Sequence, residues 1–177
     1  MKTPLMALLL WTCSGLAQAL PDAVRLSEAN WWQWGRSEMS WLGFPIYRAT
    51  LWVAGVPTTT PAASATSALQ IDYLRDIPRE RLVQTSVDEM RLLGASEAQL
   101  QRWEPELRRV FPEVKEGDSI VGVHYPGRGA AFFHRGRATG EVVDAEFARL
   151  FFGIWLDPHS RSPSLHAALL KRPESRA

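Results

Sequence analysis

The stretch GFPIYRATLWV, residues 43–53, predicts a long β-strand with two unlike faces. Successive side chains of a strand point to opposite sides, which separates the residues into two sets. The sets are Tyr47, Ala49, Leu51 and Val53 on one face, and Phe44, Ile46, Arg48, Thr50 and Trp52 on the other. The first is typical of a core face. The second places a cation and a hydroxyl among large apolar groups, which is unusual for either a core or a surface.

The composition is that of one globular domain. The chain has 177 residues, of which 46% are hydrophobic and 22% charged, so a sizeable core is expected and disorder is not. A net charge of +1 is too balanced for a nucleic-acid binder or a polybasic membrane-surface protein. Eight Trp and seven Phe predict a bulky aromatic core or, as the alternative, an aromatic-lined cavity.

The first nineteen residues have the pattern of a signal peptide. Lys2 supplies the positive charge, residues 5–11 are apolar, and Ala17-Gln18-Ala19 is a small-x-small cleavage site. We therefore expect cleavage after Ala19 and a single exported domain over residues 20–177, periplasmic or secreted. No later apolar run is long enough to span a bilayer. A lipoprotein anchored at Cys13 is the alternative, although the residues before that cysteine suit lipidation poorly.

Cys13 is the only cysteine, so the mature domain would contain none. That excludes disulfides, thiolate metal sites and a cysteine nucleophile. The four histidines lack an HxxxH or HExxH spacing, and we expect neither a metal nor a cofactor. A serine-hydrolase elbow of the GxSxG type is also missing.

The rest of the chain predicts strands and helices in separate groups. Strands are expected over 23–42 with a turn, 68–74, 119–125, 130–134 and 139–143, and helices over 76–94, 96–111, 144–155 and 163–170. Asp76 is expected to cap the first helix, Ser96 and Gln99 to form a capping box, and Pro105 to kink or restart the second helix. Residues 57–67 predict a surface loop, either a lid or a connector. This order predicts an α+β domain whose antiparallel sheet is covered by helices.

Several blocks taken together resemble the bacterial chalcone isomerase-like family. They are WLGFPIYRATLW (41–52), ALQIDYLRDI (68–77) with SVDEM (86–90), FPEVKEGDSI (111–120), and FFGIWLDP (151–158) leading to LHAALL (165–170). The resemblance implies a large curved antiparallel sheet under a layer of helices, with a cleft between them. In that superfamily plant enzymes close a flavanone ring, and related non-enzymatic members bind fatty acids. It therefore implies a small hydrophobic or amphipathic ligand.

The catalytic set of the plant-like enzymes is not intact in this chain. The resemblance implies an arginine immediately before the WLG segment, where Ser40 stands, and Arg36 is the nearest replacement. It also implies a tyrosine after the next strand, where Arg79 stands, because Tyr73 comes several residues too early. Thr50 or Arg48 would fill the threonine position on the long strand.

Arg48 and Thr50 are the first candidates for binding a ligand, since two residues apart on a strand they project from one face and could both meet a carboxylate or phenolate. Trp52 on the same face would supply an apolar wall. The alternative is that the Arg48 stem lies along a sheet edge and its head stays in water. Arg36 is a weaker candidate as an anion anchor. Tyr47 and Tyr73 are candidates for cleft phenols, with half-buried core tyrosines as the alternative.

These observations support three hypotheses. The first is an exported, non-catalytic protein that binds a fatty-acid-like ligand in a sheet–helix cleft. The second is an isomerase or lyase of the chalcone isomerase type, with arginine and a hydroxyl stabilising an oxyanion. The third is an envelope scaffold without a ligand.

Overall fold

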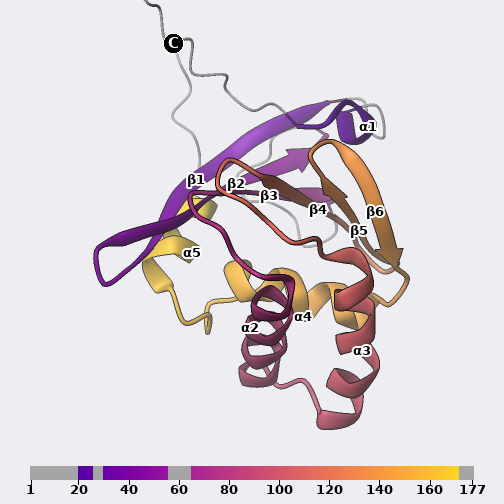
Figure 1. Ribbon diagram of the computed structural model, residues 1–177. Helices are drawn as coiled ribbons and strands as arrows, with labels where there is room; N and C mark the ends of the chain where they lie inside the picture. The colour runs from indigo at the N-terminus through magenta and orange to yellow at the C-terminus, as the bar shows by residue number, and fades with distance from the viewer. Residues whose placement is uncertain (1–19, 26–29, 56–64, 172–177) are drawn as a thin grey trace, which may run out of the picture.

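A computed structural model describes residues 20–25, 30–55 and 65–171 of the chain (Figure 1). In chain order its elements are α1 (Asp22–Arg25), β1 (Trp31–Trp41), β2 (Phe44–Ala54), β3 (Ser67–Tyr73), α2 (Arg79–Leu92), α3 (Glu97–Val110), β4 (Ser119–Tyr125), β5 (Gly129–His134), β6 (Arg137–Val142), α4 (Ala145–Leu156) and α5 (Pro163–Leu170). The predicted signal peptide and most of the predicted loop over residues 57–67 lie outside the described ranges.

The six strands form one antiparallel sheet in the order β1-β2-β3-β4-β5-β6, so each strand pairs with its neighbour in sequence. Helices α2, α3 and α4 cover one face of this sheet, which we call the inner face, and α5 lies against β1 (Figure 1). The predicted α+β architecture, an antiparallel sheet under a layer of helices, is confirmed. None of the described helices has the length and apolar character needed to cross a membrane.

Strand β2 has the two faces that its sequence predicts. Ala49, Leu51 and Val53 are buried on the inner face, and Leu51 lies opposite Leu69 of β3. Arg48 and Thr50 point to the outer face, away from the helices. The strand begins and ends one residue later than predicted.

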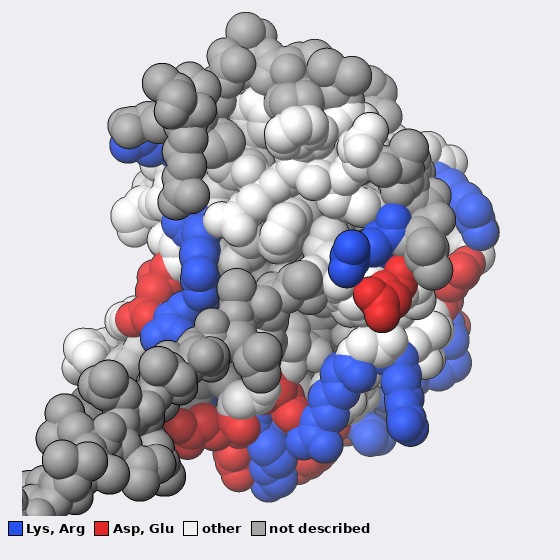
Figure 2. Space-filling view, turned by 90° about the horizontal axis from the view of Figure 1, so that it is seen from above, with Lys and Arg blue, Asp and Glu red and all other residues white. Residues whose placement is uncertain are grey.

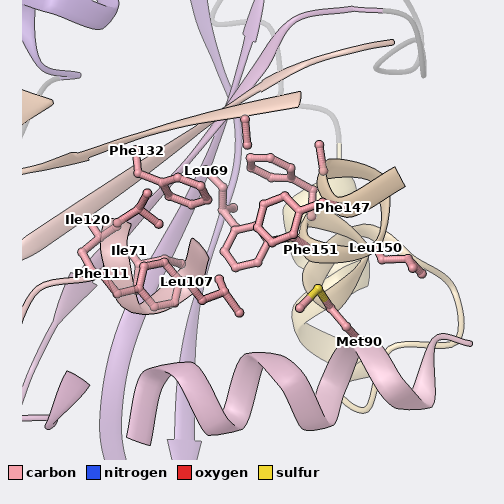
Figure 3. Close-up of a cluster of buried hydrophobic side chains, with 14 of the residues drawn as sticks. Leu69, Ile71, Met90, Leu107, Phe111, Ile120, Phe132, Phe147, Leu150 and Phe151 are labelled. Carbon is pink, nitrogen blue, oxygen red and sulfur yellow. The ribbon is translucent and has the colours of Figure 1, made fainter. Parts of the chain in front are cut away.

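The core lies between the inner face and the helices, and it is rich in aromatic rings (Figure 3). Phe151 of α4 lies at its centre. Its ring centroid is 5.2 Å from that of Phe132 on β5 and 5.6 Å from that of Phe147 one helical turn earlier. Phe111, directly after α3, packs against both Phe132 and Phe151. Burial of several such rings, each covering a large apolar area, accounts for much of the driving force of folding.

A second, smaller apolar cluster covers part of the outer face. Leu20 and Val24, at the start of the described chain, pack against small and branched residues of β3, β4 and β5. Trp31 donates a hydrogen bond of 3.0 Å from Nε1 to the carbonyl of Val24, which fastens α1 to β1. Figure 2 views this side of the molecule, and where the atoms are not grey it shows uncharged residues near the middle with basic and acidic side chains mostly toward the margins.

Helix α5 is held unusually close to β1. A Cβ atom at Gly35 would lie 2.1 Å from the carbonyl oxygen of Leu169, so only glycine permits this approach. The adjacent Trp34 donates from Nε1 to the carbonyl of Leu170 at 3.0 Å. These two neighbours on β1 fix the last helix over the open end of the sheet.

The helix signals of the sequence are confirmed in part. The capping box of α3 is complete, because Ser96 accepts from the Gln99 amide and Gln99 from the Ser96 amide. Asp76, however, does not cap α2: its carboxylate accepts from the amide of Glu116 at 2.9 Å and from Nζ of Lys115 at 3.0 Å.

Helix α3 continues through Pro105 from Glu97 to Val110, so the predicted restart near Glu104 does not occur. Pro105 lies on the exposed side of the helix. Because proline has no N–H, the carbonyl of Gln101 lacks its usual helical donor.

Candidate ligand-binding cavity

A cavity of about 680 Å³ lies between the inner face of the sheet and helices α2, α4 and α5. Its depth is apolar, with walls formed by Leu69, Ile71, Ile120, Phe132, Phe151 and Phe152. Ligand cavities for small molecules in proteins span about 300 to 1,000 Å³ and are mostly apolar, so the size and character suit one small apolar or amphipathic molecule.

Two periodicities in the sequence build these walls. On β3, every second residue faces inward, which places Leu69, Ile71 and Tyr73 in the cavity. On α2, Leu82, Ser86 and Glu89 recur at a spacing of three to four residues and line the opposite wall. The helix therefore contributes polar groups to a cavity whose sheet side is largely apolar.

Two tyrosines place their phenols in the cavity. Tyr47 of β2 and Tyr73 of β3 are register partners whose ring centroids lie 6.3 Å apart. The hydroxyl of Tyr47 accepts a hydrogen bond of 3.0 Å from Nε1 of Trp155 on α4. Burial raises the pKa of Tyr47 from 10.0 to about 12, against the lowering effect of the Trp155 bond. Burial also raises the pKa of Tyr73, with Tyr47 as a smaller cause. Both phenols are therefore protonated at neutral pH and can donate to a ligand oxygen.

The charged residues of the cavity gather at its opening. Arg75 in the β3–α2 connection, Arg81 in the first turn of α2, and Arg161 before α5 all line the cavity and are all exposed. Within the described part of the chain, neither Arg75 nor Arg81 forms an ion pair. Arg161 is paired with Glu89, with 3.4 Å between Nε and the carboxylate.

Glu89 is the more buried partner at the opening, since 16% of its side chain is exposed against 62% for Arg161. Burial is the main cause that raises the pKa of Glu89 above its usual value, and the Arg161 guanidinium opposes this rise. The other carboxylate at the cavity, Asp76, is held by Lys115. The arginines therefore outnumber the available carboxylates, and the opening is suited to an anionic group.

The structure puts Arg48 and Thr50 on the other face of the sheet from this cavity. Arg48 donates from Nε to Glu38 at 3.1 Å, and 46% of its side chain is exposed, so the guanidinium points into water. Thr50 is buried on the same outer face, opposite Gln70. The prediction that this side of β2 lines a cleft was wrong. The two faces of β2 were assigned correctly, but the cavity lies on the inner face and not on the face of Arg48 and Thr50.

Two further candidates also lie away from the cavity. Arg36 pairs in register with Thr50 on the outer face and is exposed, and Trp52 packs partly against the outer apolar cluster. Of the six residues proposed from the sequence, Tyr47 and Tyr73 line the cavity and are brought together by β-pairing.

The remaining polar residues of the cavity were not singled out from the sequence. Arg75, Arg81 and Arg161 are exposed residues near helix ends or in connections, where charge is ordinary. Glu89 lies on the cavity side of α2, and its sequence context does not mark it as a site residue. Two of them lie in blocks that carry the family resemblance, Arg75 in ALQIDYLRDI and Glu89 in SVDEM, but neither was proposed as a site residue. These residues come from the β3–α2 connection, helix α2 and the α4–α5 connection. Only the tertiary structure shows that they face one another.

The domain is of the α+β class. It has an antiparallel six-stranded sheet, a helical layer on one face and a cavity between them. The model of the chalcone isomerase-like family matches residues 19–171, and the chain belongs to that family. The suggested family resemblance is thereby confirmed.

Two known proteins are similar to this chain. An uncharacterized protein of Haemophilus influenzae is 26% identical over 147 residues, covering 83% of this chain and 71% of the relative. The crystal structure of a fatty-acid binding protein of Arabidopsis thaliana aligns with a TM-score of 0.60 and 11% identity, covering 80% of this chain and 87% of that one. At that identity the likeness shows a shared fold.

Proposed function

We propose that the protein binds one fatty-acid-like carboxylate, without catalysing a reaction, in the cavity between sheet and helices. The observation that carries this proposal is the cavity of about 680 Å³, apolar in its depth and lined at its opening by Arg75, Arg81 and Arg161. The acyl chain lies against the inner face of β3 to β5. The carboxylate lies at the opening, where Arg75 and Arg81 are free of internal ion pairs with described residues.

Two observations favour binding over catalysis. The residues that would replace the family's arginine and threonine, Arg36, Arg48 and Thr50, lie on the outer face and cannot reach a molecule in the cavity. The phenols of Tyr47 and Tyr73 are kept protonated by burial, which makes them hydrogen-bond donors and poor bases at neutral pH. A structural neighbour that binds fatty acids supports the same class of ligand.

Calorimetric titration with sodium dodecanoate and with 1-dodecanol tests the proposal. The double variant Arg75→Glu/Arg81→Glu is expected to weaken dodecanoate binding by roughly tenfold or more, because each arginine contributes a charge-assisted hydrogen bond. The same variant should change dodecanol binding little, since the alcohol has no charge.

Arg79→Glu is the matched control. Arg79 lies on the same turn of α2, is exposed like Arg81, and does not line the cavity. Its substitution makes the same charge change as either single replacement in the double variant, without touching the opening. The proposal fails if wild-type protein binds neither probe, or if Arg79→Glu weakens dodecanoate binding as much as the double variant does.

The ligand itself is found by extracting the protein purified from its native host and analysing the extract by mass spectrometry. We further propose that the protein is exported, on the basis of the signal-peptide pattern over residues 1–19. Amino-terminal sequencing of the protein from a periplasmic extract should begin at Leu20. An intact Met1, or absence of the protein from both the periplasmic extract and the culture medium, contradicts the export proposal.

A further inference from the structure

The β1–β2 hairpin carries a patch of exposed large apolar side chains at its turn. Trp41, Leu42 and Phe44 are 65%, 76% and 68% exposed. The hairpin extends beyond the rest of the sheet (Figure 1), which puts its turn at the edge of the molecule. Such residues are usually buried, and a cluster of three at a projecting turn points to an interaction.

The turn holds an apolar residue, Leu42, in a backbone conformation that is unfavourable for leucine. Leu42 has φ of 50° and Gly43 has φ of 80°, which is the left-handed conformation that two-residue hairpins require. Glycine, asparagine or aspartate adopts this conformation readily, whereas leucine is disfavoured. The Leu42 side chain recovers nothing by packing, because it is the most exposed of the large apolar residues among those described. The Leu42 side chain is thus available for a contact outside the protein.

The charged residues nearest to this apolar turn lie at its base, as expected for a segment that inserts into a lipid surface. No charged residue occurs in the sequence from Met39 to Tyr47. The exposed ion pair of Glu38 and Arg48 then spans the two strands at the base. Arg75 lies beside this base, because the amide of the preceding Leu74 donates to the carbonyl of Ile46 at 2.9 Å.

The patch is too small for a stable protein interface. Specific protein–protein interfaces bury about 1,200 to 2,000 Å² in total, and three side chains cannot supply one partner's share. A bilayer interface needs less, since Trp, Phe and Leu insert only about 5 to 10 Å into it. A strand rises about 3.3 Å per residue, so residues 41–44 fit within that depth.

We propose that the hairpin turn, Trp41, Leu42 and Phe44, inserts into the surface of a lipid bilayer and docks the cavity opening beside it. Trp41 belongs to both features, because it lies in the turn and also lines the cavity. Aromatic side chains favour the membrane–water interface, and Arg75 contacts anionic headgroups there. An apolar ligand can then move between bilayer and cavity along Trp41 with little exposure to water. This inference goes beyond ligand binding, and its test uses protein without ligand.

Co-sedimentation with vesicles of phosphatidylethanolamine and phosphatidylglycerol tests the proposal. Leu42→Asn/Phe44→Ser is expected to lower the partition coefficient by roughly tenfold or more, because it removes apolar area from the inserting turn. Asn is favoured at the left-handed position, so the substitution at residue 42 should not lower the thermal unfolding temperature of this variant. Neither residue lines the cavity, and dodecanoate affinity should be unchanged.

Leu92→Asn is the control, because Leu92 is an exposed apolar residue, at 57%, on the far end of α2. It should leave the partition coefficient within about twofold of the wild type. The proposal is overturned if wild-type protein does not sediment with the vesicles, or if Leu92→Asn reduces sedimentation as much as the hairpin variant. It is also overturned if light scattering shows an oligomer of the wild type that the hairpin variant dissociates, since the turn would then bind a second copy.

Discussion

The hydroxyl of Tyr47 has two roles in the structure. It accepts the Nε1 hydrogen bond of Trp155, which ties β2 to α4 across the cavity, and its proton remains free to donate to a ligand. Replacement by phenylalanine leaves the Trp155 donor without this acceptor. A cost of about 1 kcal/mol in the free energy of unfolding is expected at neutral pH.

The raised pKa of Tyr47 makes stability depend on pH in the alkaline range. The unfolded chain ionises this phenol near pH 10.0, whereas the folded protein holds the pKa at about 12. Between these values the unfolded state binds fewer protons, so the free energy of unfolding falls as pH rises, by roughly 1 kcal/mol per unit. Below pH 10.0 this contribution is fully present.

Urea denaturation from about pH 9 to about pH 11 measures this effect. Wild-type protein should lose stability more steeply than Tyr47→Phe, and the slope that remains in the variant includes the contribution of Tyr73. Equal slopes would show that Tyr47 does not keep its proton in the folded state.

At the scale of single residues, the sequence predicted which faces of β2 its side chains occupy but not where the empty space lies. Tyr47 and Tyr73 were proposed as cleft phenols, and both line the cavity. Arg48 was proposed on chemical grounds, because a cation among apolar residues suggests an anion site. A void depends on how far α2, α4 and α5 stand from the sheet, and no local pattern encodes that distance.

Among the elements, α4 has the most strongly anchored start. The carboxylate of Asp144 accepts from the amides of Glu146 and Phe147, at 3.0 and 2.9 Å, and from Nε1 of Trp103 on α3 at 2.9 Å. Burial alone would raise the pKa of Asp144, but these three bonds lower it. One side chain thereby caps one helix and fastens it to another.

The two helix caps should therefore differ in their effect on stability. Asp144→Ala is expected to cost about 2 to 3 kcal/mol, since it removes a cap and leaves the buried Trp103 donor unpaired. Ser96→Ala, which removes only the cap of α3, should cost about 1 kcal/mol. The Asp144 contribution should also fade as pH falls below 3.8, because its folded pKa is lowered. Urea denaturation of both variants checks the order, and equal costs would mean that the Trp103 bond contributes nothing.

The contrast between these caps and Asp76 shows which helix starts can be predicted from the sequence. Ser96 with Gln99, and Asp144 before an apolar run, are local signals, and both helices begin where these predict. Asp76 has the same local context but bonds to Lys115 and Glu116, far along the chain. When a side chain bonds to a residue distant in the sequence, it is no longer available as a helix cap. Capping rules based on the local sequence then predict wrongly.

For the whole molecule, occupation of the cavity should appear as added stability. A ligand that binds only the folded state stabilises it by about 2.7 kcal/mol at one hundred times its dissociation constant. Thermal unfolding with saturating dodecanoate should therefore shift upward by several degrees. Ile71→Trp, which adds volume inside the cavity, is expected to keep the fold and abolish the shift.

The contrary result is equally clear. If Ile71→Trp unfolds at a higher temperature with dodecanoate just as the wild type does, the ligand occupies some other part of the molecule. Trp substitution at Leu156, which is partly buried on α4 but does not line the cavity, controls for added bulk as such.

The order of the strands in the sheet also governs how the chain can assemble. Five pairings join strands adjacent in sequence, and four of them are short-range hairpins or nearly so. Only β3 and β4 are separated by two helices, over residues 74–118. Closing that segment costs more chain entropy than any other step, so we expect two early nuclei, β1–β3 and β4–β6, whose joining along β3–β4 limits the folding rate. Ile71 and Ile120, which are register partners across that seam and also line the cavity, are then brought together last. The cavity is thus expected to form in the final folding event.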